Sequence, residues 1–237
     1  MADMTMEIAV EPETDDSPER YLVPTARIQS DDPTIIAFAR ANCGKGDDIA
    51  QAVSLYYAVR DGIRYDPYSI QLLPEELGAV KCLKHKIGFC IPKAALLAAA
   101  ARACGIPARV GYADVKNHLA TGTLTEMMGT DIFIWHGYTD LFLGGKWVKA
   151  TPAFNIELCD KFKVLPLEFN GSEDSLFHPF DAEDRPHMEY VRYHGTFHDV
   201  PVEPIIHAFA TTYWRMFNGV HCKRPGDFHA EAEAEYQ

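Results

Sequence analysis

The chain has 237 residues, of which 47% are hydrophobic, and its 34 Asp and Glu outnumber its 22 Lys and Arg. This composition is typical of a globular protein, and the chain is long enough for one large domain. No stretch approaches the roughly 18 consecutive apolar residues of a membrane span, so we expect no membrane insertion.

The acidity is concentrated at the two ends. Residues 1–20 contain seven acidic residues and one arginine, and residues 227–237 contain four acidic residues and no basic one, so residues 21–226 are nearly neutral. We predict a disordered acidic tail over 1–20, because too few apolar groups are present to offset the entropy of ordering. We predict a single domain over 21–226 and an acidic C-terminal tail over 227–237. The lack of a basic surface argues against nucleic-acid binding.

The N-terminus has neither the basic start nor the apolar core of a signal peptide, which favours a cytoplasmic location. The six cysteines are irregularly spaced. In a reducing compartment they are interpreted as thiols and not as a disulfide framework. The sequence carries no signal for an oligomeric state.

Local signals predict helices in the first half of the chain. Asp32-Pro33 begins a helix that ends near Gly44, and Asp47 or Asp48 begins another that ends at Gly62. Residues 63–65 are predicted to be extended.

The stretch 86–110, KIGFCIPKAALLAAAARACGIPARV, predicts a central helix. Pro92 is tolerated only in the first turn, so the helix begins near Ile91 and ends at Ala103 or Cys104, before Gly105. It is apolar on nearly all sides, which is typical of a helix buried in the middle of a domain.

The second half of the chain predicts strands. Residues 109–115 form one strand, residues 116–130 a polar loop, and residues 131–143 and 146–151 a hairpin around Gly144-Gly145. Residues 155–200 give no clear pattern, and an amphipathic helix follows from Pro204 to Phe217. Helices followed by strands predict an α+β domain.

Cys90 lies at the start of the central helix, where unpaired N–H groups and the partial positive charge of the helix converge. These groups favour a thiolate, lower its pKa and can stabilise an oxyanion. Cys104, at the opposite end, is predicted to be an inert packing residue. The alternative for Cys90 is a small buried hydrophobic residue.

A nucleophilic cysteine needs a base, and His136 is the best candidate. It lies within a strand, on the face of Ile132, Ile134 and Tyr138. The alternative is a hydrogen-bonded core histidine.

A third group could orient the imidazole. The two-residue turn pairs Phe142 with Trp147 and His136 with Ala153. Thr151 is then a diagonal neighbour of His136, and Asn155 shares the same face if the strand continues past Pro152. Asp140 lies about 13 Å along the strand and is too far.

Three segments carry a family resemblance: YYAVRDGIRYDP (56–67), GFCIPKAALLAAAARACGIPARVGY (88–112) and WHGYTDLFLGGKWVKATPAFN (135–155). They resemble the transglutaminase-like superfamily of papain-fold thiol enzymes. The resemblance implies an α+β fold whose nucleophile begins a central buried helix packed on an antiparallel sheet. It implies Cys90 and His136 as catalytic residues.

The resemblance further implies acyl transfer through a thioester, without a cofactor. The substrate is expected to be a peptide or protein amide, and hydrolysis is favoured over transglutaminase-type transfer to an amine. The family usually ends the second hairpin arm in Asp-Pro-Thr, whereas this chain has Thr151-Pro152-Ala153. Thr151 or Asn155 is therefore expected to orient His136.

Two other classes of protein compete with this interpretation. Loss of the aspartate favours a degenerate domain that acts as a binding or interaction module. Cys82, His85 and Cys90, or His194 and His198, suggest a metal site, but neither spacing matches a known zinc pattern, so we predict no bound metal.

Overall fold

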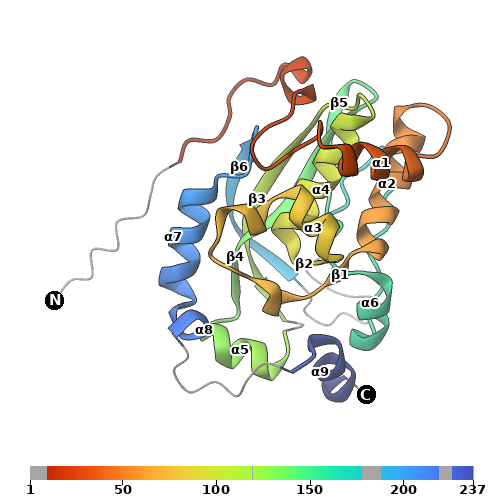
Figure 1. Ribbon diagram of the computed structural model, residues 1–237. Coiled ribbons are helices and arrows are strands. Elements are labelled where there is room, and N and C mark those ends of the chain that lie inside the picture. The colour runs from red at the N-terminus through yellow and green to blue at the C-terminus, as the bar shows by residue number, and fades with distance from the viewer. Residues whose placement is uncertain (1–9, 119, 178–187, 219–225, 237) are drawn as a thin grey trace.

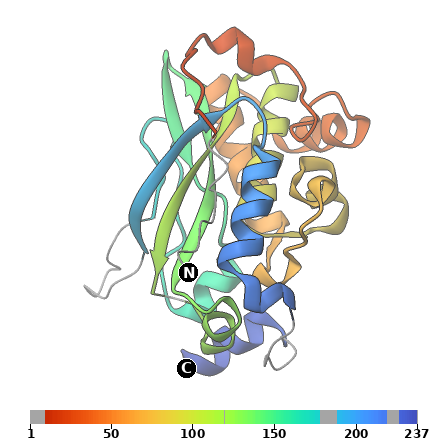
Figure 2. The same ribbon diagram turned by 90° about the vertical axis from the view of Figure 1, so that its left-hand side faces the viewer.

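The computed structural model describes residues 10–118, 120–177, 188–218 and 226–236. Its centre is a four-stranded antiparallel sheet in the order β5-β4-β3-β6. Most helices lie on one side of this sheet (Figures 1 and 2). The strands are β3 (Ala108–Asn117), β4 (Ile132–Leu143), β5 (Lys146–Ala150) and β6 (Met188–Phe197), and a separate parallel pair joins β1 (Arg64–Tyr65) to β2 (Ile87–Gly88).

The described residues also form α-helices along the whole chain and short 3₁₀ turns before α3. The helices are α1 (Pro33–Asn42), α2 (Asp48–Gly62), α3 (Ala79–His85), α4 (Cys90–Ala103), α5 (Gly122–Met128), α6 (Ile156–Phe162), α7 (Val202–Thr212), α8 (Trp214–Asn218) and α9 (Phe228–Glu235). The 3₁₀ turns are η1 (Pro18–Leu22), η2 (Pro67–Ser69) and η3 (Pro74–Leu77).

The predicted start signals of the first two helices are confirmed. The carboxylate of Asp32 accepts from the Thr34 N–H, and that of Asp47 accepts from the Ala50 N–H. Each bond satisfies a backbone donor that a helix start leaves unpaired.

Helix α4 forms the core, as predicted. Every residue from Cys90 to Arg102 is buried. The helix packs between the sheet and α1, α2 and α3 (Figure 1). Its alanines let the neighbouring backbones approach closely, and the Thr139 hydroxyl of β4 donates to the Ala94 carbonyl at 2.9 Å. The predicted α+β class, with the cysteine at the N-terminus of a central helix on an antiparallel sheet, is confirmed.

Lys93 is a fully buried cation within this core. Its ammonium donates to the carbonyls of Arg60 at 2.9 Å and Ile63 at 2.6 Å, which satisfies the C-terminal end of α2. Burial lowers the pKa of Lys93 to about 7. The lysine thus joins two helices by hydrogen bonds and packing.

The hairpin has the predicted turn and the predicted Phe142–Trp147 pair. However, β5 ends at Ala150, opposite Thr139, so the extrapolated pairing of His136 with Ala153 does not form. The strand β4 is also irregular. Between the pairs Ala113–His136 and Val115–Phe133 it contains one extra residue.

At this bulge Trp135 adopts a left-handed conformation with φ of 55°. A bulge changes the alternation of side chains along a strand. The expectation that Ile132 and Ile134 share the face of His136 is therefore wrong. Local sequence gave no sign of the bulge, because Trp135 is not a residue type that favours positive φ.

Two regions for which the sequence predicted no helix or strand contain regular structure. Residues 116–130 contain α5 and are not only a loop, and residues 155–200 contain α6 and β6. The predicted helix over 204–217 begins at Val202 and is interrupted at Tyr213.

The two acidic ends differ from the tails that were predicted. Residues 1–9 lie outside the described residues, but contacts with the domain begin before Tyr21. The Glu13 N–H donates to the Thr196 carbonyl at 2.9 Å, and Asp16 pairs with Arg109. Hydrogen-bond and ion-pair partners on the sheet hold this part of the chain in place. The local sequence gives no sign of these partners.

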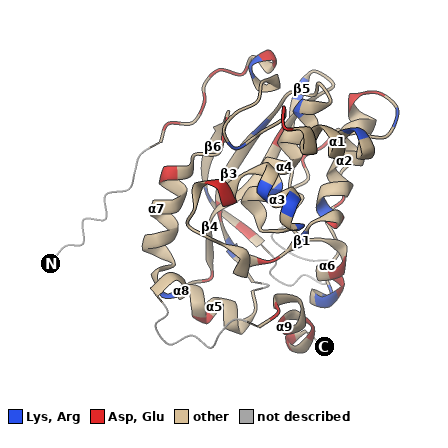
Figure 3. Cartoon of the chain, viewed as in Figure 1, with Lys and Arg blue, Asp and Glu red and all other residues tan. Residues whose placement is uncertain are grey.

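At the C-terminus, Asp227 caps α9, which buries Phe228, His229 and Ala232. The acidic residues of α9 lie at the lower edge of the domain (red in Figure 3). No helix in the described part of the chain has the length and apolar character required to cross a bilayer.

Candidate active site

Cys90 is the first residue of α4, and Phe89 before it offers no side-chain cap. The thiol is only 8% exposed. Burial raises the pKa of Cys90 to about 11, although the N–H groups of Gly137, Ile91 and Cys90 itself act in the opposite direction. The predicted lowering of this pKa is therefore wrong for the resting protein, because the cost of burying the charge exceeds the effect of the helix start.

His136 lies in β4 and is 2% exposed. Its ring packs edge-on against Phe177, with centroids 5.7 Å apart. Burial lowers the pKa of His136 to about 4. Within the described residues its Nε2 has no hydrogen-bond partner. At neutral pH both the thiol and the imidazole are thus uncharged.

Gly137 brings the cysteine and the histidine together. The N–H of Gly137, in the peptide that joins it to His136, is close enough to the Cys90 thiol to oppose the rise of its pKa. A Cβ on Gly137 would lie 3.1 Å from the Cα of Ile91, so only glycine allows α4 to approach β4 this closely. Sequence reasoning missed this residue, although its place immediately after His136 was a usable signal.

Thr151 follows β5 and is buried. Its backbone is held on both sides, since its N–H donates to the Ser175 carbonyl at 3.1 Å and its carbonyl accepts from the Tyr56 hydroxyl at 3.2 Å. Its own hydroxyl is buried without a partner in the described structure. The side chain that replaces the family's aspartate is therefore fixed in place, and its hydroxyl is available to form a hydrogen bond.

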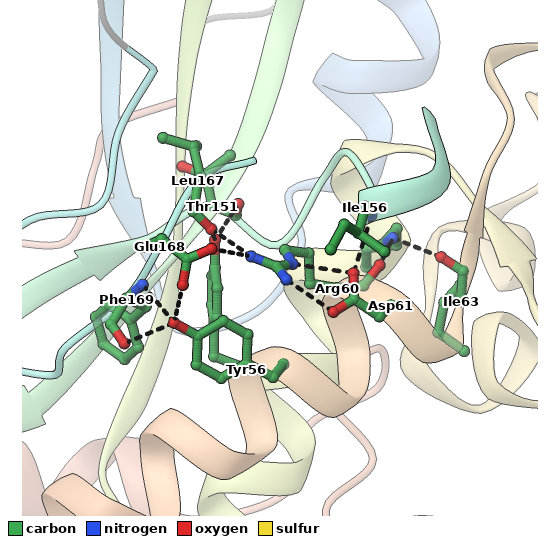
Figure 4. Close-up of polar contacts among 11 residues, drawn as sticks. Tyr56, Arg60, Asp61, Ile63, Thr151, Ile156, Leu167, Glu168 and Phe169 are labelled. Carbon is green, nitrogen blue, oxygen red and sulfur yellow. Dashed lines mark hydrogen bonds and ion pairs between the residues drawn. The ribbon is translucent and has the colours of Figure 1, made fainter. Parts of the chain in front are cut away.

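The segment after Thr151 is anchored by α2. Arg60 donates to the Leu167 carbonyl at 2.8 Å and pairs with Asp61 and Glu168, as Figure 4 shows. Asp61 also accepts from the Ile156 N–H at 3.0 Å. These contacts hold the chain on both sides of α6 against the domain core.

Asn155, the other candidate for orienting His136, is engaged elsewhere. The side-chain oxygen of Asn155 accepts from the Tyr65 N–H at 3.0 Å, so it joins the start of α6 to β1. Asp140 pairs with Arg109 at 2.9 Å, as expected of a residue too far from the imidazole.

A narrow apolar slot of about 20 Å³ borders Cys90. Its walls come from β1, η2, α4, α5, β4 and α7, and they are almost entirely aromatic or aliphatic. The lining residues are Tyr65, Pro67, Ile70, Phe89, Cys90, Met128, Phe133, Ile134, Phe209 and Tyr213.

Helix α9 connects two walls of this slot. On the side of β1 and η2, His229 contacts the Tyr65 carbonyl at 3.0 Å and Glu231 accepts from the Tyr68 hydroxyl at 2.6 Å. On the side of α5, Glu235 accepts from the Gly122 N–H at 2.9 Å. The C-terminal segment therefore holds two walls of the slot together, which its acidic sequence did not indicate.

A second cavity, of about 310 Å³, lies between α7 and the strands β3, β4 and β6. His194 forms part of it, pairing with Asp114 at 2.7 Å and stacking on Trp135 at 4.1 Å. Glu189, near the start of the same strand, pairs with His118.

Among the described residues, no group of three or more His, Cys, Asp or Glu is arranged to hold a metal ion. Cys82 is buried and His85 is exposed beside Glu76.

A buried helix that begins with a cysteine and packs on an antiparallel strand carrying a histidine defines the cysteine-enzyme-like class of folds. Residues 37–152 match the core of the transglutaminase-like superfamily, a range that contains Cys90, His136 and Thr151. Over this segment the match confirms the resemblance found in the sequence.

A crystal structure described as "a Putative Cysteine Protease from Cytophaga hutchinsonii" is also similar, with 19% identity and a TM-score of 0.44. The match covers 78% of this chain and 56% of that one, so this chain spans little more than half of that protein's length. No curated protein matches the sequence.

Proposed function

We propose that the protein is a thiol-dependent acyl-transfer enzyme that hydrolyses amide or peptide bonds, with Cys90 as nucleophile and His136 as base. The observation that carries the proposal is the close approach of Gly137, the residue after His136, to the start of α4, where a Cβ on Gly137 would lie 3.3 Å from the Cys90 carbonyl oxygen. Packing alone does not require a thiol there or an imidazole beside it, whereas nucleophilic catalysis requires both.

In this reaction the Cys90 sulfur forms a bond to the carbonyl carbon of an amide as its proton passes to His136. The carbonyl oxygen becomes an oxyanion next to the N–H groups at the start of α4, which can donate to it. When the C–N bond breaks, His136 returns the proton to the leaving amine and a thioester remains. Water then attacks the thioester, and a primary amine in its place gives transglutaminase-type transfer.

The resting protonation state sets how the first step occurs. With pKa values of about 11 for Cys90 and about 4 for His136, the thiol is not ionised before attack at neutral pH. Proton transfer must accompany attack, as in general-base catalysis. We further propose a peptide or protein amide as the substrate, with a side chain suited to the apolar slot beside Cys90.

A binding module without catalysis is the second candidate. Two observations favour it: Thr151 stands in place of a carboxylate, and burial raises the pKa of Cys90. Such a module would form no covalent intermediate.

The two functions are separated by trapping the acyl-enzyme. The purified protein is incubated with a library of peptide amides, and intact mass spectrometry detects a thioester while amine release is followed in parallel. The matched variants are Cys90→Ala and Cys82→Ala, the latter removing another buried thiol of the core. Catalysis predicts an adduct and turnover that only Cys90→Ala abolishes, whereas binding without an adduct supports the module.

A further inference from the structure

Three polar side-chain atoms near the candidate site are buried without a partner in the described structure: His136 Nε2, Thr151 Oγ1 and the Tyr190 hydroxyl. Buried polar atoms are nearly always hydrogen-bonded, so a group of partnerless atoms calls for an explanation. Tyr190 lies on β6, paired with Val115, and nothing in the local sequence connected it with Cys90 or His136.

Phe177 lies between His136 and Tyr190. Its ring packs on His136, and its backbone is close enough to the Tyr190 hydroxyl to lower the pKa of that group, which burial raises. The Thr151 hydroxyl acts on Tyr190 in the same direction. The two hydroxyls are therefore neighbours, although they are not aligned as a hydrogen bond.

The hairpin brings Thr151 towards His136. Since Ala150 pairs with Thr139, Thr151 follows next to Tyr138, diagonally displaced from His136 by two residues of β4. Diagonal neighbours are about 7–8 Å apart at the backbone, within reach of an imidazole and a hydroxyl that extend towards each other.

We propose that Tyr190 is a positioning residue for His136, and that the hydroxyls of Thr151 and Tyr190 together replace the carboxylate of the family. Their oxygens accept the Nε2–H of His136, which fixes this tautomer and leaves Nδ1 to take the Cys90 proton. The catalytic part of this inference rests on the proposed function, and the tautomer part does not.

Neutral hydroxyls orient an imidazole but do not stabilise an imidazolium as a carboxylate does. This arrangement therefore matches a cysteine and histidine that are uncharged at rest. Hydrogen bonds of a catalytic site often align only when a substrate is bound. The test should therefore include the protein alkylated at Cys90, whose added amide stands in for the acyl group.

The experiment is ¹⁵N NMR of the His136 ring in the free and the Cys90-carbamidomethylated protein. The variants are Tyr190→Phe and Thr151→Val, which remove one hydroxyl each. Tyr193→Phe is the matched control, because its ring stacks on that of Tyr190 at 5.5 Å but its side chain is largely exposed. Thr151→Ser keeps the hydroxyl and should behave as the wild type.

We expect a single Nε2–H tautomer in the wild type and in Tyr193→Phe, and a mixture in Tyr190→Phe and Thr151→Val. With an amide substrate, kcat should fall about tenfold in Tyr190→Phe while KM stays within about twofold, as for loss of one hydrogen bond used in the transition state. An unchanged tautomer in both hydroxyl-deleted variants overturns the proposal. If the tautomer changes in the hydroxyl-deleted variants but neither the wild type nor any variant shows turnover, the positioning role is supported and the proposed hydrolysis is rejected.

Discussion

Gly137 lies so close to the start of α4 that a Cβ at this position would be 3.1 Å from the Cα of Ile91 and 3.3 Å from the Cys90 carbonyl oxygen. Both neighbours are backbone atoms, which cannot move aside as a side chain could. We expect Gly137→Ala to lower the free energy of unfolding by about 1–3 kcal/mol, the usual cost of overpacking.

Urea unfolding measures this cost. The same variant should alter the alkylation rate of Cys90, because the peptide that faces the thiol is displaced. Gly62→Ala is the matched control, since a Cβ there meets nothing within 4 Å. Equal stability of the two variants would show that α4 and β4 are further apart than described.

His136 should make stability depend on pH. Its pKa is about 4 in the folded protein and 6.5 without the protein environment, so the unfolded chain binds more protons between these values. Its contribution to the free energy of unfolding is fully present above about pH 6.5 and is lost as the pH falls towards 4. The loss amounts to at most about 3 kcal/mol. Urea unfolding between pH 4 and 7 should show that the free energy of unfolding rises less steeply with pH in His136→Gln than in the wild type. His85→Gln, at an exposed site, should leave the slope unchanged.

Lys93 should give a second pH dependence, at higher pH. Because burial lowers its pKa to about 7 from 10.5, the unfolded chain again binds more protons in this interval, and stability should rise from pH 7 to pH 9. Lys93→Met should abolish this rise and leave the carbonyls of Arg60 and Ile63 without their donor, at a cost of about 1–3 kcal/mol. Lys84→Met, at an exposed site, is the control, and a rise that persists in Lys93→Met would refute the assignment.

A carboxylate at position 151 should favour the charged forms of His136 and Cys90. In Thr151→Asp the new charge favours an imidazolium at His136, which in turn favours a Cys90 thiolate. We expect alkylation of Cys90 by iodoacetamide at pH 7 to accelerate at least about tenfold, the equivalent of one pKa unit. Peptide mapping by mass spectrometry assigns the reaction to Cys90, and the neutral Thr151→Asn controls for shape. If the Asp and Asn variants react equally, position 151 does not act on the histidine.

Phe228 should control access to the thiol. It is 2% exposed and packs against Tyr65, Tyr68 and Phe162, with ring centroids about 6 Å apart. Phe228→Ala should loosen α9 and so release the walls of the apolar slot, raising the alkylation rate of Cys90 severalfold. Phe142→Ala, on the distant end of the hairpin, should not do so. An unchanged rate in Phe228→Ala would mean that α9 does not contribute to closing the slot.

The sequence by itself determined the elements whose causes are local. Asp32 and Asp47 cap helices through residues two or three positions away, Pro92 admits only a helix start, and Gly144-Gly145 admits only a tight turn. The alanine-rich apolar character of α4 required burial. The same local signals placed a cysteine at the start of that helix and a histidine in the strand packed on it.

Only the tertiary structure decided the surroundings, the partners and the pKa values of these residues. The left-handed Trp135 and the bulge before His136 depend on three strands pairing at once, and Tyr190 reaches the candidate site from a segment without a clear local pattern. The acidic end of the chain forms α9 because Tyr65 and Tyr68 offer it partners. The pKa of Cys90 rises because the desolvation of a charge depends on every neighbour in space, whereas the helix start that opposes it depends on the few residues next to it in sequence.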